Sequence, residues 1–262
     1  MFVSGIVLNG GMGSGKDTVG GYICQSYGYE RIATAEPMYR VADHARHAVT
    51  DRHVEYSRAR LLQLLEGLLG SSRSLSGEVL PAADIMGIAA RTLDLARDTD
   101  LLDPSISKPR NFLQAFGDLV RAERPDAFTD YLLRDAVGRS VDRWLDEGEF
   151  RFIVTDARVK YEMDAFRAGS DYARRILGES VDYRIHIVRI NVSEETAIER
   201  IVSRDGTSRE EVMKSLKHHT EQELRSIPDS YFDHVIDSEQ SFERVYTATD
   251  AMMRDIGGGP RA

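Results

Sequence analysis

The sequence predicts an α/β protein in which a mostly parallel sheet carries helices on both faces, a three-layer α/β/α arrangement. Short runs rich in Val and Ile, each typical of a buried strand, occupy residues 3–8, 152–155, 183–192 and 234–236. Segments whose apolar residues recur at helical spacing separate these runs. Such alternation is typical of βαβ units, whose sheets bind ligands at the carboxyl ends of their strands.

Residues 40–108 depart from this alternation and predict a helical insertion. Leucines at helical spacing fill residues 61–69, and apolar residues repeat the pattern over 85–95 with no strand-like run between. We therefore expect a single domain over residues 1–262, with the insertion as a subdomain within it.

Composition favours small ligands over polymers. The chain has 262 residues, with 34 Lys and Arg against 43 Asp and Glu, so its formal net charge is −9. An acidic balance argues against a nucleic-acid polymer as the main partner. No apolar run approaches the roughly 18 residues of a membrane span, and the start lacks the pattern of a secretion signal. With one cysteine, Cys24, the sequence fits the reducing cytoplasm, and it leaves a homodimer open.

A glycine-rich loop follows the first strand run. Residues 10–18 read GGMGSGKDT and contain the pattern G-x-x-x-x-G-K ahead of a helix that begins near residue 17. Glycines let a loop wrap around phosphates so that backbone N–H groups and the helix N-terminus face anionic oxygens, while the lysine reaches the β- and γ-phosphates. The residues expected to bind the nucleotide here are Gly11, Gly13, Ser14, Gly15, Lys16, Asp17 and Thr18.

The residue after the lysine is unusual. Ser or Thr commonly stands there as a Mg²⁺ ligand, whereas this chain has Asp17 followed by Thr18. A carboxylate facing a triphosphate would be repelled, so we expect Asp17 to point away. Thr18 is then expected to supply the hydroxyl to phosphate or to Mg²⁺.

The loop resembles the G-G-x-G-S-G-K-G-T loop of adenylate-kinase-like nucleoside monophosphate kinases, where one residue also separates Lys from Thr. The likeness is strongest to phage-type deoxynucleoside monophosphate kinases, with dephospho-coenzyme A kinases as near relatives. It is carried by residues 14–19, 113–121 and 155–158 with Glu162. It covers residues 1–40 and 110–240, and it implies a P-loop kinase fold with ATP and Mg²⁺ as cofactors.

Asp156 and Arg158 follow the second strong strand run. An acid at a strand end can hold Mg²⁺ directly or through water, and an arginine beside it can bridge the donor and acceptor phosphates. We therefore expect Asp156 to bind metal and substrate and Arg158 to be catalytic. The alternative is that Asp156 caps the next helix and Arg158 pairs with Glu162.

Arg200 and Arg204 lie four residues apart on one helix face. Residues 200–210 resemble the lid of monophosphate kinases, which brings arginines onto the triphosphate and excludes water on closing. We expect Arg200 to bind the nucleotide and Arg204 to be catalytic. The alternative is pairing with Glu195 and Glu199 on a solvated helix. Beyond the lid, Ser208 and Glu211 form a capping-box pattern that predicts a helix over 208–224.

For the acceptor, the resemblance points to Gln114 and Arg121. A planar guanidinium recognises a monophosphate through two parallel hydrogen bonds, and Arg124 is the reserve candidate. Glu36 follows a possible second strand, where an acid can contact a base or sugar. Two aromatic residues beside this segment either stack on a base or belong to the core, and these are Phe112 and Phe116.

These residues lead to the hypothesis of phosphoryl transfer from ATP to a deoxynucleoside monophosphate, giving the diphosphate. Three alternatives stay open: a kinase of another small molecule such as dephospho-coenzyme A, a kinase of a modified base in DNA, and a non-catalytic nucleotide-switch ATPase. The net charge of −9 argues against DNA, and the lid arginines favour transfer over a switch.

Overall fold

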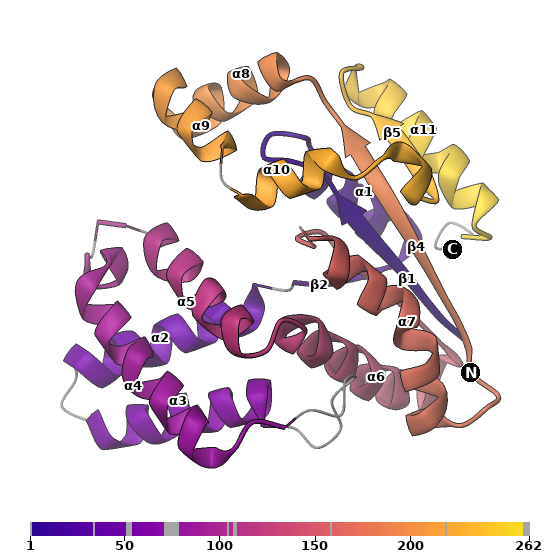
Figure 1. Ribbon diagram of the computed structural model, residues 1–262. Helices are drawn as coiled ribbons and strands as arrows, with labels where there is room; N and C mark the ends of the chain where they lie inside the picture. The colour runs from indigo at the N-terminus through magenta and orange to yellow at the C-terminus, as the bar shows by residue number, and fades with distance from the viewer. Residues whose placement is uncertain are drawn as a thin grey trace. The chain divides into compact units, whose positions relative to one another are not determined.

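The computed structural model of the chain describes residues 2–33, 35–50, 54–70, 79–103, 105–106, 109–157, 159–217 and 219–258. The chain divides into two compact units (Figure 1). We call residues Met1–Ala33 with Ala136–Ala262 the sheet unit and residues Thr34–Asp135 the helical unit.

The sheet unit is built on a parallel sheet with the strand order β2-β3-β1-β4-β5. Every pairing between neighbouring strands is parallel, so the carboxyl ends of the strands share one edge. The four predicted strand runs are confirmed, and a strand of three residues, β2, joins them. The strands in the described part of the chain are β1 (Phe2–Asn9), β2 (Glu30–Ile32), β3 (Glu149–Val154), β4 (Asp182–Asn191) and β5 (His234–Asp237).

Helices cover both faces of this sheet. On one face, Ile6 and Val188 share a buried cluster with Val19 of α1 (Lys16–Tyr27) and Met252 of α11 (Phe242–Asp255). On the other face, the ring of Phe152 lies 6.5 Å from that of Phe166 in α7 (Lys160–Leu177). The predicted three-layer α/β/α class is therefore confirmed. The other helices of this unit are α6 (Ala127–Glu147, which begins in the helical unit), α8 (Glu194–Asp205), α9 (Arg209–Leu216), α10 (His219–Ser226) and the 3₁₀ turn η2 (Asp229–Tyr231).

The helical unit has a core of its own, to which Leu61, Leu65, Ile88, Phe112 and Phe116 belong. Phe112 and Phe116 are both 0% exposed, so they are core residues and do not present a stacking surface to a base. The helices of this unit, apart from the start of α6, are α2 (Glu36–Thr50), α3 (Val54–Leu69), α4 (Ala82–Asp98), η1 (Asp100–Leu102) and α5 (Arg110–Glu123).

The expected insertion over 40–108 lies inside this unit, which continues to Asp135. The extension has a physical reason, since α5 buries Phe112, Phe116 and Val120 in the same core as α3 and α4. The segment that carries Gln114 and Arg121 therefore packs with the insertion helices.

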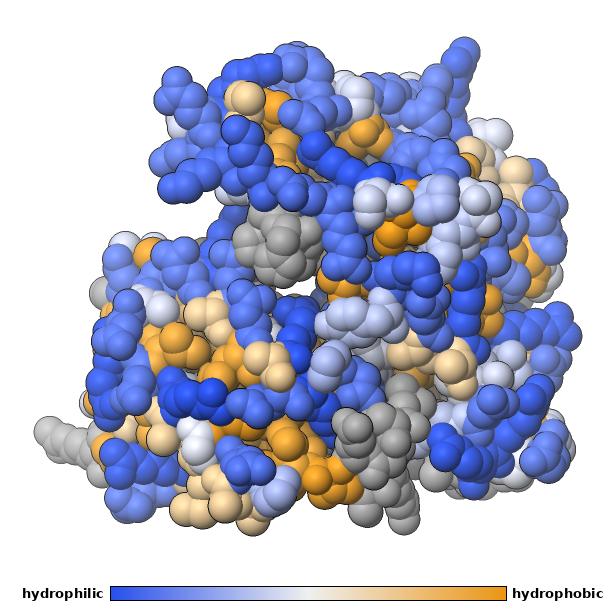
Figure 2. All heavy atoms as spheres, viewed as in Figure 1, coloured by the Kyte–Doolittle hydropathy of each residue, from blue (hydrophilic) through white to orange (hydrophobic). Residues whose placement is uncertain are grey.

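The face of the molecule in Figure 2 is mostly hydrophilic, with apolar residues interspersed. Large exposed apolar side chains are far apart in the sequence, as with Tyr56, Met86 and Phe242. Within the described part of the chain, none of the helices combines the length and apolar character needed to cross a bilayer.

Candidate active site

The glycine-rich loop joins the end of β1 to the start of α1, at the carboxyl edge of the sheet. Gly13 and Gly15 adopt φ angles of 76° and 83°, in the left-handed region that favours glycine. A Cβ on Gly13 would lie 2.6 Å from the carbonyl oxygen of Ala197 in α8. The glycines therefore allow both the turn and the close approach of a neighbouring helix.

Hydrogen bonds hold the carbonyl groups of this loop. The Ser14 N–H donates to the Gly11 carbonyl over 3.2 Å, and Lys16 Nζ donates to the same oxygen over 3.4 Å. The Ser238 hydroxyl donates to the Ser14 carbonyl over 2.7 Å. Carbonyl oxygens bound in this way are not directed at an anion, which suits a loop that binds phosphate. Lys16 itself is buried, with 7% of its surface exposed.

Arg200 braces the loop from α8. Its guanidinium donates to the Gly13 carbonyl over 3.3 Å and to the Ser238 carbonyl over 2.6 Å. It thereby links the loop to the segment after β5. The described contacts of Arg200 are with the loop backbone and Ser238. Arg200 was expected to bind the nucleotide itself, and its bracing of the loop carbonyl was not predicted.

Asp17 and Thr18 lie in the first turn of α1. The Asp17 carboxylate pairs with Arg31 of β2 over 2.5 Å, and its side chain is 60% exposed. The Thr18 N–H donates to the Gly15 carbonyl over 3.0 Å, and Thr18 is exposed. Arg31 therefore neutralises the charge of the Asp17 carboxylate, which is directed toward β2.

Arg204 lies near the end of α8, with its side chain 64% exposed. It donates two hydrogen bonds to the Asp205 carboxylate, over 2.7 and 2.9 Å. These bonds raise the pKa of Arg204, and the charge of Asp17 acts in the same direction. The charge of Arg204 therefore interacts with that of Asp17 in the first turn of α1.

The lid-like segment 200–210 corresponds to the end of α8, a short connection and the start of α9. Gly206 ends α8 with a φ of 65°, and Ser208 with Glu211 forms the predicted capping box at the start of α9. The helix expected over 208–224 is wrong as one element, because α9 ends at Leu216 and α10 begins at His219. The break puts the acids of residues 221–223 on a separate short helix.

Asp156 lies two residues beyond β3, at the same sheet edge as the loop. Asn9, fully buried at the end of β1, donates to the Ala157 carbonyl over 3.3 Å. This bond ties the segment that carries Asp156 to the strand that leads into the loop. Arg158 lies outside the described residues.

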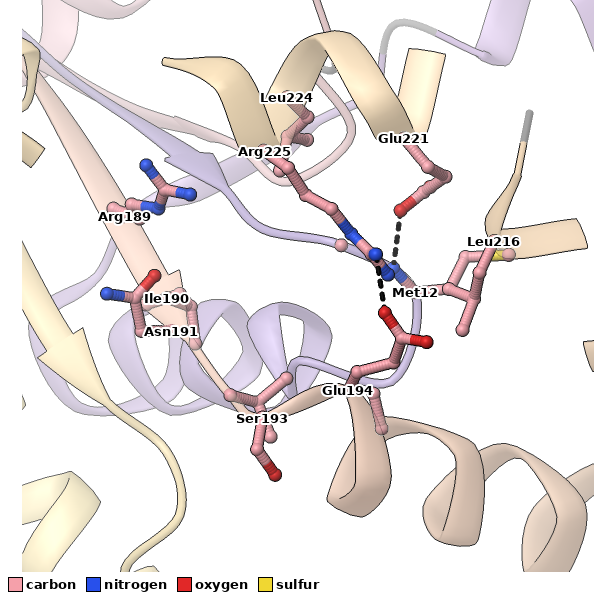
Figure 3. Close-up of a pocket in the computed structure, with 13 residues that line it drawn as sticks. Met12, Arg189, Ile190, Asn191, Ser193, Glu194, Leu216, Glu221, Leu224 and Arg225 are labelled. Carbon is pink, nitrogen blue, oxygen red and sulfur yellow. Dashed lines mark hydrogen bonds and ion pairs between the residues drawn. The ribbon is translucent and has the colours of Figure 1, made fainter. Parts of the chain in front are cut away.

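A pocket of about 270 Å³ opens beside the loop (Figure 3). Its wall includes Glu221 of α10, which is 2% exposed and accepts a hydrogen bond from the Met12 N–H over 3.2 Å. Sequence analysis missed Glu221, since one acid among many in a helix carries no local signal. The lining residues are Gly11, Met12, Arg189, Ile190, Asn191, Val192, Ser193, Glu194, Ala197, Leu216, Glu221, Leu224 and Arg225.

The residues expected to bind the acceptor lie in the helical unit. Glu36 begins α2 and Gln114 lies on α5, and both are exposed. The Arg121 guanidinium lies 5.2 Å from the centre of the Phe128 ring. A Cβ on Gly117 would lie 2.8 Å from Arg121 Nη1, so the glycine makes room for the guanidinium.

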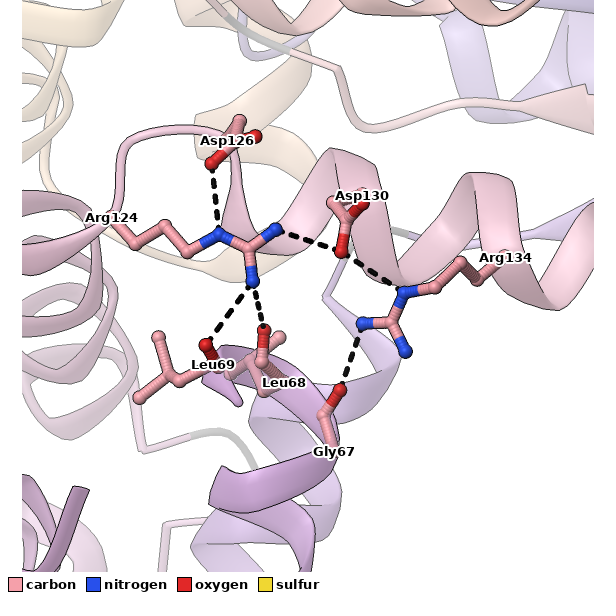
Figure 4. A network of polar contacts seen from close by, with 7 residues as sticks. All are labelled: Gly67, Leu68, Leu69, Arg124, Asp126, Asp130 and Arg134. Carbon is pink, nitrogen blue, oxygen red and sulfur yellow. Dashed lines mark hydrogen bonds and ion pairs between the residues drawn. The ribbon is translucent and has the colours of Figure 1, made fainter. Parts of the chain in front are cut away.

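Arg124, the reserve candidate for the acceptor, is a structural residue (Figure 4). It is 1% exposed, pairs with Asp130 over 2.9 Å and with Asp126 over 3.1 Å, and donates to the Leu69 carbonyl over 3.3 Å. Carbonyl groups at a helix end need donors from outside the helix, and Arg124 supplies one to the end of α3. The expectation that Arg124 contacts substrate is therefore wrong.

Comparisons with known proteins gave distant structural likenesses. No protein-family model and no curated protein matches the chain. Crystal structures that resemble it include TT1252 from Thermus thermophilus, with 18% identity, 98% of this chain and 99% of that chain covered, and a TM-score of 0.43. An unliganded sugar kinase from Janibacter sp. HTCC2649 has 15% identity, 98% and 96% coverage and a TM-score of 0.41. Deoxyadenosine kinase from M. mycoides with bound dATP has 15% identity, 97% and 99% coverage and a TM-score of 0.37. Because the identities and TM-scores are this low, the function is argued below from the glycine-rich loop and the residues around it.

Proposed function

We propose that the protein is an ATP-dependent phosphotransferase whose acceptor is a deoxynucleoside monophosphate. The observation that carries the proposal is the loop between β1 and α1, with Gly13 and Gly15 in left-handed conformations and Lys16 folded back to the Gly11 carbonyl. A loop of this kind offers backbone N–H groups, a helix N-terminus and one ammonium group to a single triphosphate.

In the proposed reaction, an oxygen of the acceptor phosphate forms a bond to the γ-phosphorus of ATP. The bond from that phosphorus to the β–γ bridging oxygen breaks, and ADP leaves with the electron pair. Such transfer needs alignment and neutralisation of charge more than covalent help. Lys16 would neutralise the β- and γ-phosphates, and Arg204 would do so when the segment 200–210 closes over them.

Thr18 and Asp156 would hold Mg²⁺. A hydroxyl and a carboxylate are hard oxygen ligands, and Mg²⁺ commonly takes only one or two protein ligands and completes its octahedron with phosphate and water. The bond from Asn9 to the Ala157 carbonyl supports this pairing, because it tethers the Asp156 segment to the strand that precedes the loop. The ion would neutralise charge between the phosphates. The catalytic role of Arg158, which would bridge the donor and acceptor phosphates, remains a prediction from its sequence position beside Asp156.

Glu36, Gln114 and Arg121 are proposed to bind the acceptor. The Arg121 guanidinium lies over the Phe128 ring, 5.2 Å from its centre, and a planar guanidinium is suited to a phosphate. The exposed side chains of Gln114 and Glu36 would contact the base and sugar.

The proposal is tested by incubating the protein with Mg-ATP and a panel of ribo- and deoxynucleoside monophosphates and resolving the products by anion-exchange chromatography. We expect a deoxynucleoside diphosphate and ADP in equal amounts. Lys16→Ala is expected to abolish transfer, whereas Lys214→Ala, on the exposed surface of α9, serves as the matched control and keeps it. An inert panel in the presence of ATP binding would refute the acceptor class. The absence of ATP binding would refute the whole proposal.

Arg121→Ala separates the two substrates in the same assay. We expect KM for the monophosphate to rise at least about tenfold, since a hydrogen-bonded charge is lost, while KM for ATP stays unchanged. Unchanged acceptor kinetics would show that the monophosphate binds elsewhere.

A further inference from the structure

Helix α10 places a carboxylate on the phosphate-binding loop. Glu221 Oε2 accepts a hydrogen bond from the backbone N–H of Met12 over 3.2 Å (Figure 3). The residue as a whole is 2% exposed. Backbone N–H groups of such loops are the groups that bind phosphate oxygens. The Met12 N–H, one of the groups expected to bind phosphate, is therefore already hydrogen-bonded to the Glu221 carboxylate.

Gly11 is part of this contact. A Cβ on Gly11 would lie 3.1 Å from Glu221 Oε2, which is tighter than nine in ten contacts of real Cβ atoms. A side chain here would displace the carboxylate by a few tenths of an ångström, so the glycine accommodates its present position. The pocket of about 270 Å³ beside it, lined by Met12, Leu216 and Leu224, gives the Glu221 side chain space into which it can turn.

Two other contacts hold α10 in this position. Glu223 accepts a hydrogen bond from the Lys160 N–H at the start of α7, over 3.1 Å. Arg225 pairs with Glu194 at the start of α8, over 2.5 Å (Figure 3). α10 thus contacts the start of α7, the start of α8 and, through Glu221, the glycine-rich loop.

The position of Met12 decides which phosphate competes with Glu221. The inner phosphates of a nucleotide bind the N–H groups near the helix start, around Lys16. Met12 lies four residues earlier, at the end of the loop remote from α1, where the outermost phosphate of a triphosphate would be bound. A phosphate and a carboxylate cannot share one N–H, and like charges a few ångströms apart repel each other.

We propose that Glu221 sets the preference of this loop between nucleoside triphosphates and diphosphates. Its carboxylate must leave Met12 when a triphosphate binds, whereas a diphosphate leaves the contact intact. Glu221 therefore weakens the binding of ATP relative to that of ADP. This inference rests on the proposed function, because it takes the loop to be the ATP site.

The test is calorimetric titration of the protein with Mg-ATP and Mg-ADP, comparing the wild type with Glu221→Gln. Gln keeps the size of the side chain and an acceptor oxygen but removes the charge. We expect the Kd for ATP to fall roughly tenfold, because a charge-assisted contact no longer competes, while the Kd for ADP changes less than about twofold. The matched control is Glu210→Gln, which removes one carboxylate charge from the exposed start of α9 and should leave the ratio of the two Kd values unchanged.

Equal changes for ATP and ADP, or no change in either, would overturn the inference. Should Glu221→Gln fail to fold, Glu221→Asp serves instead, since it keeps the charge but is one methylene too short to hold Met12 in the same way. It should shift the ratio in the same direction. The chromatographic assay tells the two proposals apart. Phosphoryl transfer together with an unchanged ratio of the Kd values for ATP and ADP refutes this inference alone. A changed ratio without phosphoryl transfer refutes only the proposed deoxynucleoside monophosphate acceptor.

Discussion

Arg121 and Arg124 are three residues apart in the sequence, yet their guanidinium groups have different surroundings. Arg121 lies over the Phe128 ring, whereas Arg124 is 1% exposed and pairs with Asp126 and Asp130. Burying an ion pair stabilises a protein weakly, but removing one partner leaves a charge without compensation and is costly. At the residue scale, burial therefore separates a structural arginine from a candidate for binding phosphate.

Arg124→Met is expected to lower the free energy of unfolding by about 3 kcal/mol, the lower end of the range for breaking a buried pair, because Arg134 also contacts Asp130. Chemical denaturation measures this change. Arg97→Met, which breaks an exposed pair with Asp94 in the same unit, should cost less than about 1 kcal/mol. Equal losses in the two variants would contradict the structural role of Arg124.

At the element scale, the unit of function is the strand, loop and helix formed by β1, residues 10–15 and α1. The loop glycines differ in kind from Gly21 in the helix. Gly13 has a positive φ and a helix carbonyl close to its missing Cβ, whereas Gly21 has nothing within 4 Å of that position. A side chain is therefore excluded at Gly13 by both the backbone and its neighbour, and it is tolerated at Gly21.

Gly13→Ala is expected to destabilise the protein by about 1–3 kcal/mol, because alanine rarely adopts this φ, and to lower ATP affinity at least about tenfold by displacing the loop. Gly21→Ala, in the same helix-forming segment, should instead raise stability by about 0.5–1 kcal/mol, since alanine loses less entropy in a helix. Denaturation and ATP titration of both variants check the pair. If Gly13→Ala bound ATP with the affinity of the wild type, the loop would not need the close contact between Gly13 and the Ala197 carbonyl.

At the scale of the whole molecule, the parallel sheet brings β1, β3 and β4 to one edge and encloses titratable groups within the fold. His186 lies on β4, with its ring 6.0 Å from that of His234. Burial lowers the pKa of His186 below its ordinary value of 6.5, against the charge of Asp233, which raises it. Arg184 and His234 act in the same direction as burial.

This shift predicts a loss of stability as pH falls below 6.5. The unfolded chain takes up the proton first, so protonation favours unfolding until the pH passes the lower pKa of the folded state. The wild type should therefore lose more Tm between about pH 7.5 and about pH 5.5 than His186→Gln, which has no titrating group at this position. Parallel Tm curves for the two proteins would exclude a contribution of His186.

Local signals in the sequence were enough for the strands, the glycine-rich loop and the capping box of α9, since each depends on residues close together in the chain. Hydrophobic periodicity, a glycine pattern and a Ser–Glu spacing are readable without knowing what packs against them. The arrangement of Arg200 on the loop carbonyl, of Arg124 in the helical core and of Glu221 on Met12 depended on tertiary structure, because each contact joins segments more than 50 residues apart. An arginine or a glutamate in a helix has the same local pattern whether it faces solvent, a core or a phosphate-binding loop, and only the packing of distant segments decides among them.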